Sequence, residues 1–524
     1  MSKHKTGWQR ISRIAAMGMA VVVSGCFAGT APEERIPPPE AFEYPMRDAP
    51  ALTLMTEFPD MGMPNRGQID VEYEKRTGIA IKHMGGVPMK DARFDYLLAS
   101  GNLPDIFMNN WLEYPGGPEK AVEQGVIMPL NEVIDKYAPN FKRVLEERPD
   151  IDKMVKTDSG IYYAFPFIRS ESGRVYGGPI VRRDWLDELG LAVPTTIDEW
   201  YAMLKAFRRD KGAAAPLTLR TLFMGERTAG FAGAFGVMGN FYVKNGKVVY
   251  GYMEEGYRDY LATMSQWYGE GLIDKDFAVL DLETVDKKLL SGISGATVGW
   301  QGYIEKYNQA ALTNDSTARY IAAPYPTLIQ GTLPEFGQLD NAYAGTSSAA
   351  IKASTKHLEA AVRWLDYAYS PEGSMLNTYG IEGVTYTMVD GEPEYTELVV
   401  ANPDGLSSDQ VMLQYAHQTN FPMIQRDSRL KWKFEETNQA IEVWKKTKHE
   451  NYLLPPITPT PEEAGELSAL LERIGEYVRD TEIRIILGEA PVEAYDEMVK
   501  ELSALGIERV LEIKQAAYER YLRR

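Results

Sequence analysis

The sequence predicts an α/β protein in which helices connect the successive strands of a sheet. Short apolar segments alternate with amphipathic segments of helical period from residue 51 onward, and this order is typical of βαβ units. The chain has 524 residues, of which 44% are hydrophobic and 25% are charged, an ordinary globular composition. At about 150 residues per domain, this length accommodates about three domains or two large lobes.

The first part of the globular region shows strands and helices in turn. Residues 51–56 form a predicted buried strand, and an amphipathic helix at 68–77 ends at a glycine. A short strand at 79–83 precedes a helix around 94–100. The motif Gly-Asn-Leu-Pro breaks that helix, and residues 105–108 resume as a strand. We therefore expect helical crossovers between these strands.

Capping boxes and apolar periodicity predict further helices. Thr196 with Glu199, and Thr460 with Glu463, fit the pattern of a helix N-terminus. Apolar residues at helical spacing are Trp200, Met203, Leu204 and Phe207 in the first helix, Leu467, Leu470, Leu471, Ile474 and Val478 in the second, and Leu358, Val362, Leu365 and Tyr369 in a third. Asn245-Gly246 between two apolar segments predicts a β-hairpin.

The N-terminus predicts export and a lipid anchor. The apolar stretch Ile14–Val23 is shorter than the about 20 residues that span a bilayer, so residues 1–25 are expected to be a signal peptide. Its basic residues are Lys3, Lys5, Arg10 and Arg13. The segment Val23-Ser24-Gly25-Cys26 resembles a bacterial lipobox, with Val23 where Leu is more usual, and Cys26 would become the diacylated N-terminus. The alternative is an ordinary secretory signal that contains a cysteine by chance. Residues 26–50 are rich in Ala, Glu and Pro, which predicts a flexible tether.

Charge and cysteine content exclude several classes of protein. The net charge of −18 disfavours both nucleic-acid binding and a polybasic membrane patch, which need the opposite sign. No other stretch approaches 18 uninterrupted apolar residues, so the lipid anchor is the only expected membrane contact and the rest of the chain is expected to be soluble. Cys26 is the only cysteine, so we expect no intramolecular disulfide and no multi-cysteine metal site.

Known catalytic and metal-binding motifs are absent from the sequence. The histidines are His4, His83, His357, His417 and His449, and no two of them have metal-ligand spacing. There is no P-loop, dinucleotide-binding glycine motif, nucleophile elbow, HExxH or EF-hand loop. We therefore expect no catalytic residues, no metal and no cofactor. Paired carboxylates have no fixed spacing in glycosidases, so a secreted carbohydrate-active enzyme stays open as an alternative.

Short motifs spread over almost the whole chain carry a family resemblance. They are Leu97–Ile106, Gly125–Asn131, Tyr162–Pro166, Arg183–Leu191, Pro194–Thr196, Tyr268–Asp274, Gly380–Tyr386, Ile486–Gly488 and Leu505–Ile507. Together these segments resemble the extracellular solute-binding proteins (family 1) of carbohydrate ABC transporters, in the long lipoprotein form found in Gram-positive bacilli.

The resemblance implies a two-lobed fold of the type II periplasmic-binding-protein kind, with two α/β lobes, a hinge and an interlobe cleft that holds the ligand. By analogy, the first lobe comprises residues 51–166 and 324–352, and the second comprises 167–323 and 353–524. The resemblance also implies an oligosaccharide ligand, the permease subunits of an ABC importer as partners, and a position on the extracellular face of the cell membrane.

Candidate ligand contacts are aromatic and amide side chains that follow predicted strands. Aromatic rings stack on the apolar faces of sugars, and open α/β sheets bind ligands at the carboxyl ends of their strands. Asn109, Asn110 and Trp111 follow the strand at 105–108. Trp300 and Tyr303 follow a short apolar strand that begins at residue 296. The alternative for these aromatics is packing in the core.

Two further candidates come from the resemblance to the family's cleft region. Glu382 and Tyr386 lie in a glycine-flanked loop after a predicted helix. Trp185 and Trp200 have the spacing of buried helix positions, so we interpret them as packing residues. Arg169 has the chemistry to pair with an acidic sugar, but a surface arginine is the simpler interpretation.

The leading hypothesis is a lipid-anchored extracellular protein that captures an oligosaccharide in an interlobe cleft and delivers it to an ABC importer. A secreted carbohydrate-active enzyme and a surface sugar sensor or adhesion protein are the alternatives. Neighbouring permease genes would favour the first hypothesis over the others. The identity and charge of the sugar are not encoded in any motif that we found.

Overall fold

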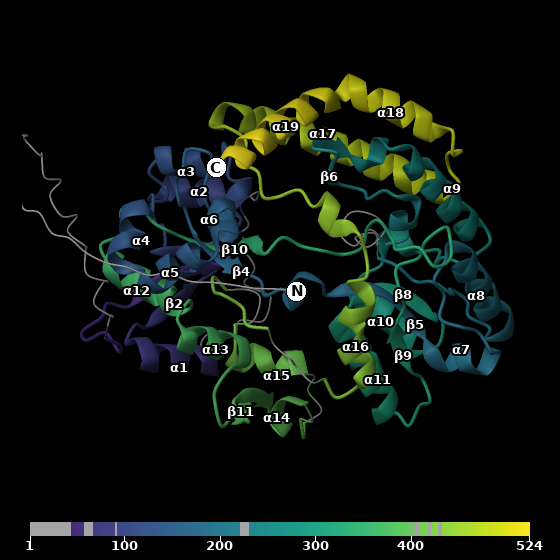
Figure 1. Cartoon of the computed structure of the whole chain (residues 1–524), viewed down its shortest axis with the longest axis horizontal. Coiled ribbons are helices and arrows are strands. Elements are labelled where there is room, and N and C mark those ends of the chain that lie inside the picture. Colours follow the sequence, from purple (N-terminus) through teal and green to yellow (C-terminus); the bar gives the residue numbers. More distant parts are fainter. Residues whose placement is uncertain are drawn as a thin grey trace, which may run out of the picture. The chain divides into compact units, whose positions relative to one another are not determined.

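Two larger β-sheets organise the part of the chain that the structure describes (Figure 1). The computed structural model describes residues 43–56, 67–87, 89, 92–220, 230–400, 402–404, 406, 408–417, 421–427 and 432–524. The predicted signal peptide, Cys26 and most of the predicted tether lie outside these residues. Residues Phe42–Arg524 form one compact unit by their internal contacts.

The first sheet has five strands in the order β2-β1-β3-β10-β4. The strands are β1 (Leu52–Thr56), β2 (Ile81–Met84), β3 (Ile106–Met108), β4 (Phe165–Ile168) and β10 (Tyr343–Ile351). β1 pairs in parallel with both β2 and β3, whereas β10 runs antiparallel to β3 and β4. The parallel pairs confirm the predicted crossover connections at the start of the globular region.

Helices α1 (Gln68–Thr77) and α2 (Ala92–Ser100) form these crossovers. α1 ends where the sequence predicted, because Gly78 adopts the left-handed conformation at a φ of 77° and donates its N–H to the carbonyl of Glu74. Glycine is suited to this position because it has no Cβ to clash there.

Further helices cover the first sheet. They are η1 (Trp111–Glu113), α3 (Gly117–Glu123), α4 (Asn131–Tyr137), α5 (Pro139–Glu147), α6 (Pro149–Val155), α12 (Leu358–Tyr367) and α13 (Pro371–Tyr379). Val362, Leu365 and Tyr369 are buried in the same core as β1, β3 and β4, although Tyr369 lies just beyond the end of α12. This packing differs from our expectation that residues 353–524 all belong to the second lobe. The remaining lobe boundaries stay a prediction.

The second sheet has three strands in the order β8-β5-β9. They are β5 (Gly177–Arg182), β8 (Ala296–Trp300) and β9 (Tyr320–Ala322), and β5 runs antiparallel to both neighbours. The helices that contact its strands are α7 (Arg183–Leu189), α11 (Gln301–Thr313) and α16 (Glu435–Trp444). α8 (Ile197–Asp210), α9 (Glu255–Gly269) and α10 (Leu282–Leu290) contribute buried residues to the cores beside this sheet. Short 3-10 turns are η2 (Ser172–Arg174), η4 (Ala232–Phe235), η5 (Gly251–Met253), η6 (Phe277–Val279) and η7 (His449–Tyr452).

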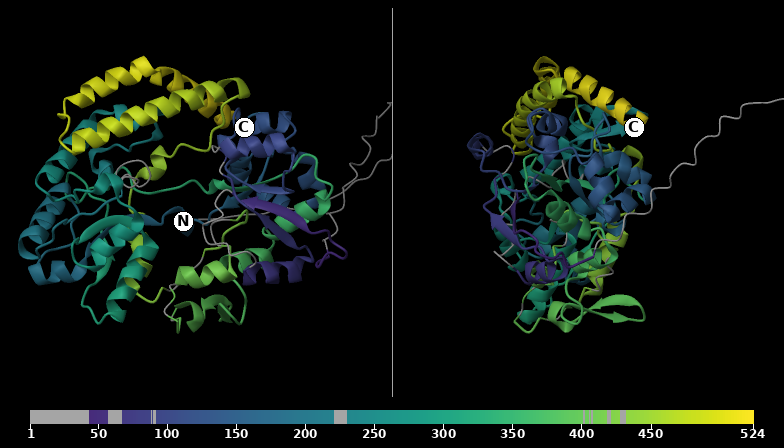
Figure 2. Two further views of the ribbon diagram at one scale, coloured as in Figure 1. Left: turned by 180° about the vertical axis from the view of Figure 1, so that it is seen from behind. Right: turned by 90° about the vertical axis from the view of Figure 1, so that its left-hand side faces the viewer.

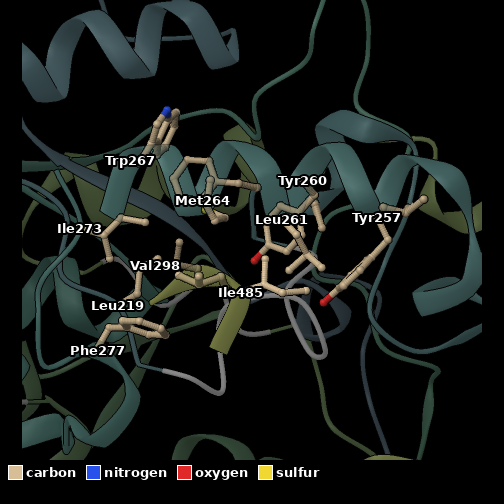
Figure 3. Packing of buried hydrophobic residues seen from close by; sticks show 14 of the residues in the cluster. Leu219, Tyr257, Tyr260, Leu261, Met264, Trp267, Ile273, Phe277, Val298 and Ile485 are labelled. Atoms are coloured by element: carbon tan, nitrogen blue, oxygen red, sulfur yellow. The ribbon is translucent and has the colours of Figure 1, made fainter. Parts of the chain in front are cut away.

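The C-terminal helices share the core of the second sheet. α17 (Pro461–Ile486), α18 (Ala494–Leu505) and α19 (Ile507–Arg523) follow one another, and α17 lies beside α9 and α19 (Figure 2). Ile485 of α17 packs with Leu261 of α9 and Val298 of β8 in one buried cluster (Figure 3). Both predicted capping boxes are present, at the starts of α8 and α17. Trp185 and Trp200 are buried in the same cluster, as expected for packing residues.

Two hairpins stand apart from the larger sheets. β6 (Phe241–Lys244) and β7 (Lys247–Tyr250) flank the predicted Asn-Gly turn, where Asn245 has a φ of 54° and Gly246 a φ of 77°. The second hairpin consists of β11 (Tyr386–Val389) and β12 (Glu392–Tyr395) and precedes α14 (Glu397–Val400) and α15 (Ser408–Tyr415).

The chain crosses between the two sheets along residues 169–176 and again along 323–342. These crossing segments are hydrogen-bonded to each other, because Arg169 N–H donates to Ala342 at 2.7 Å and Asp340 N–H donates to Arg174 at 3.0 Å. A third segment joins them where Ile168 N–H donates to Met423 at 2.7 Å. Within the described ranges, no helix combines the length and apolarity needed to cross a membrane.

Candidate functional site

A pocket with a volume of about 320 Å³ lies where the crossing segments meet strand β6 and turn η7. It is lined by Arg169, Met238, Asn240, Phe241, Tyr242, Leu339, Asp340, Asn341, Tyr343, Gly345, His449, Tyr452, Leu453 and Leu454. Aromatic rings and neutral amides make up much of this wall. Pockets of this size and lining are typical of small-molecule sites.

Asp340 is the centre of a hydrogen-bond network in the pocket wall. One carboxylate oxygen, Oδ2, accepts from the Tyr176 hydroxyl at 2.8 Å and lies 2.9 Å from Nη2 of Arg169. The other oxygen, Oδ1, accepts from the Gln338 amide at 3.2 Å. Three side chains from two crossing segments therefore fix the orientation of this carboxylate.

Arg169 is held within the protein rather than extended into solvent. Its side chain is 14% exposed, and Nη1 donates to the carbonyl of Asn341 at 3.2 Å. The guanidinium also lies 5.6 Å from the ring of Phe167. The simple surface position that we favoured for Arg169 is wrong, because the second crossing segment supplies its carboxylate and carbonyl partners.

His449 is a neutral member of the pocket wall. Its Nδ1 lies 2.6 Å from the carbonyl oxygen of Gly337, and since a carbonyl only accepts, Nδ1 carries the proton. Burial lowers the pKa of His449 below its usual value. The imidazole is therefore neutral at pH 7 and adds no charge to the pocket.

Aromatic side chains give the pocket its apolar surface. Phe241 stacks on Tyr250 with ring centroids 4.5 Å apart, and Tyr452 packs against Phe336 at 4.8 Å. The Tyr452 hydroxyl donates to Glu335 at 2.6 Å. Rings fixed in this way can stack on the apolar face of a sugar, while neighbouring amides bond its hydroxyls.

The structure brings two of the predicted site residues close to this pocket. A Cβ on the lining residue Gly345 would lie 3.1 Å from Oδ1 of Asn110, so Asn110 lies next to this part of the wall. Trp300 packs on Tyr176 with ring centroids 5.1 Å apart, and Tyr176 in turn bonds Asp340. Trp300 ends β8 and caps α11, rather than lying in a loop as predicted.

Three other predicted site residues, Asn109, Trp111 and Tyr303, lie in packing positions. Asn109 and Trp111 are fully buried, and Trp111 packs against Phe107 and Tyr114. Tyr303 lies in α11 rather than in a loop, and burial raises its pKa to about 12. A ligand contact at these residues stays a prediction.

Glu382 and Tyr386 lie at the base of the β11–β12 hairpin, outside the residues that line the pocket. Glu382 is exposed, whereas Tyr386 is buried against Tyr379 with ring centroids 5.7 Å apart. Their role in ligand binding also stays a prediction. Cys26 lies outside the described residues.

Sequence reasoning missed most of the pocket wall. Phe241 and Tyr242 were recognised only as part of a hairpin, and His449 only as a histidine without metal partners. Asp340 and Asn341 are adjacent polar residues just before β10. This is the one local signal in the sequence that could have identified them as site residues. Among the described residues, no cluster of three or more His, Cys, Asp or Glu side chains is positioned to hold a metal ion.

Comparison with known proteins gives consistent similarities. Residues 69–375 match the family model described as bacterial extracellular solute-binding protein. The fructooligosaccharide ABC transporter substrate-binding protein FusA of Streptococcus pneumoniae is 24% identical over 92% of each chain. The lipoprotein LipO of Bacillus subtilis is 26% identical over 66% of this chain and 68% of its own.

Solved structures show the same fold. The alginate-binding protein AlgQ2 superposes with a TM-score of 0.76 at 23% identity, covering 90% of this chain and 98% of its own. FusA in complex with kestose superposes with a TM-score of 0.73 at 23% identity, covering 90% of this chain and all of its own. These similarities confirm the predicted two-lobed α/β fold.

Proposed function

This chain belongs to the bacterial extracellular solute-binding proteins, and on that premise we propose that it captures an oligosaccharide and delivers it to the permease of an ABC importer. Members of this family are binding proteins, so the chain is not an enzyme. The carbohydrate-active enzyme that the sequence left open is therefore removed from the alternatives.

The observation that carries the proposal is the lining of the pocket. Phe241, Tyr242 and Tyr452 offer rings, and Asn240 and Asn341 offer amides, within one concave surface. This combination suits a ligand that has apolar faces and many hydroxyls, which is the chemistry of a sugar chain. The fructooligosaccharide-binding name of the S. pneumoniae relative supports the same class of ligand.

Trp300 and Asn110 extend the proposed site beyond the pocket wall. Trp300 is only partly buried, and its ring is held on Tyr176 beside the Asp340 network. A ring in this position can stack on a further sugar unit, which is why we propose an oligosaccharide rather than a single sugar.

The protein is proposed to act on the outer face of the cell membrane. Cys26 after Val23-Ser24-Gly25 supports diacylation at a lipobox, and the naming of LipO as a lipoprotein is consistent with it. Two acyl chains supply the two membrane signals that stable anchoring requires. Residues 27–50 would then serve as the tether.

A thermal-shift screen of oligosaccharides on the mature chain tests the proposal. A ligand that binds only the native state raises the free energy of unfolding by about 2.7 kcal/mol at 100 times its Kd, so Tm rises. We expect at least one oligosaccharide to raise Tm and its monosaccharide units to raise it less. Chromatography of the ligand after incubation should recover it intact. If no oligosaccharide changes Tm, the proposed function is wrong.

Delivery is tested in cells that lack the protein. Uptake of the oligosaccharide found in the screen should fall in these cells and return with the full chain. A sensor or adhesion protein would leave uptake unchanged, so normal uptake in the deletion strain would contradict the role in import.

A further inference from the structure

Asp340 and Arg169 form an ion pair in the wall of the pocket, with Oδ2 and Nη2 2.9 Å apart. We propose that Asp340 is a specificity-determining residue that neutralises Arg169 and thereby restricts the pocket to uncharged oligosaccharides. This inference rests on the proposed function and deepens it, because it names the charge of the ligand.

The geometry of the pair leaves no charge for an acidic sugar to neutralise. The Arg169 guanidinium has the carboxylate of Asp340 on Nη2 and the carbonyl of Asn341 on Nη1. The side chains of Arg169 and Asp340 are 14% and 23% exposed, so water screens their attraction only in part. A ligand carboxylate would have to compete with a partner that is already in place.

Asp340 is held in position independently of Arg169. The Tyr176 hydroxyl donates to Oδ2 at 2.8 Å, and the Gln338 amide donates to Oδ1 at 3.2 Å. The carboxylate therefore stays in the wall when a ligand enters. A uronate group in the pocket would have to displace this fixed carboxylate before it could pair with Arg169.

The ionisable groups that the structure describes next to the pocket supply no unpaired positive charge that would attract an acidic sugar. His449 is neutral, and Arg174 is paired with Glu450 at 2.9 Å. Glu335 is paired with Lys448 at 2.6 Å. Arg174 is also paired with Glu171 at 3.2 Å, so both of these cations already have carboxylate partners.

One further cation contacts an aromatic residue of the pocket wall. Lys514 of α19 is 4.4 Å from the centre of the Phe241 ring, and burial lowers its pKa to about 8. Phe241 lines the pocket, whereas Lys514 is not among the lining residues.

Replacing Asp340 by asparagine keeps the size of the side chain and its ability to accept from Tyr176. It removes the negative charge and leaves the Arg169 guanidinium available for another carboxylate. Arginine pairs strongly with planar carboxylates, so the variant should acquire affinity for acidic sugars.

The test uses gluco-, fructo-, manno- and galacto-tetrasaccharides, each also in a form oxidised at its primary hydroxyls to carboxylates. Affinities of the mature chain are measured by calorimetry at low and high salt. We expect the native chain to prefer the neutral member of each pair that binds. In Asp340→Asn, the affinity ratio should shift toward the oxidised member by about tenfold or more, and this gain should weaken with salt.

The double variant Arg169→Gln/Asp340→Asn is the matched control. If the gain comes from the exposed guanidinium, it disappears when Arg169 is also replaced, whereas a general loosening of the pocket would persist. Circular dichroism and Tm establish that each variant is folded.

An unchanged affinity ratio in folded Asp340→Asn overturns the inference, as does a native chain that already prefers the oxidised member. Neither of those results contradicts the proposed capture of an oligosaccharide. If no tetrasaccharide of either kind binds the native chain, the proposed function fails and this inference fails with it.

Discussion

Replacing Trp111 by alanine is expected to reduce stability and to leave ligand affinity unchanged. The sequence offered Trp111 as a sugar-stacking residue, but its side chain is 0% exposed. It lies edge-on to Phe107 at 5.6 Å and stacked on Tyr114 at 5.9 Å. All three rings belong to one buried cluster beside β3.

The size of the effect follows from this burial. A buried aromatic side chain removes about 150–250 Å² from water, which at about 25 cal/mol per Å² contributes roughly 4–6 kcal/mol. Truncation of core tryptophan to alanine costs about 3–5 kcal/mol. Nε1 of Trp111 has no hydrogen-bond partner among the described residues, and a buried unpaired donor costs about 1–3 kcal/mol. Trp111→Phe should therefore be much less harmful than Trp111→Ala.

Urea unfolding followed by circular dichroism measures the stability of each variant, and calorimetric titration with the oligosaccharide measures its affinity. Trp300→Ala is the contrast, because Trp300 is only partly buried and packs on Tyr176 beside the pocket. We expect Trp300→Ala to lose about tenfold or more in affinity with a smaller change in stability. A Trp111→Ala protein that keeps its unfolding midpoint but loses the ligand would refute this reasoning.

Three further predictions concern other parts of the chain. Gly177→Ala should weaken sugar binding, because its Cβ would lie 2.6 Å from the Trp300 ring. In the neighbouring variant Gly178→Ala, the Cβ would instead contact the core residue Trp444, so this variant should chiefly lower Tm. Burial raises the pKa of Asp366 to about 6, so the folded chain keeps a proton that the unfolded chain loses near pH 4. The free energy of unfolding should then fall by at most about 3 kcal/mol as pH rises from about 4 through 6. Asp366→Asn should lack this fall, which urea unfolding at several pH values measures. Cys26→Ser should leave the protein unlipidated, and membrane fractionation that recovers a processed, membrane-bound variant would contradict the lipobox.

Local signals in the sequence predicted much of the fold. α1 begins and ends at the predicted residues, since its apolar face and the left-handed Gly78 are both local features. The capping box at Thr196 and the Asn245-Gly246 hairpin are likewise set by neighbouring residues. The antiparallel pairing of β5 with β8 and β9 was not predicted, because pairing between distant strands leaves no local mark.

The site was harder to predict than the fold. Arg169 and Asp340 are far apart in the sequence, and only the hydrogen-bonded crossing segments bring them together. The position after a strand gave Asn110 and Trp111 the same predicted role, whereas the structure places Asn110 next to the lining residue Gly345 and buries Trp111 in the core. Side-chain direction after a strand depends on the local turn, which here is the short η1 helix.

The central claim is that an oligosaccharide binds in the pocket lined by Phe241 and Tyr452. Calorimetric titration of Tyr452→Ala and Tyr386→Ala with the same oligosaccharide tests it most directly, because both are tyrosines but only Tyr452 lines the pocket. The account predicts that Tyr452→Ala loses tenfold or more in affinity, about 1.4 kcal/mol or more, while folded Tyr386→Ala binds as the native chain does. Full affinity in Tyr452→Ala together with loss of binding in Tyr386→Ala would contradict the claim and place the ligand near the β11–β12 hairpin.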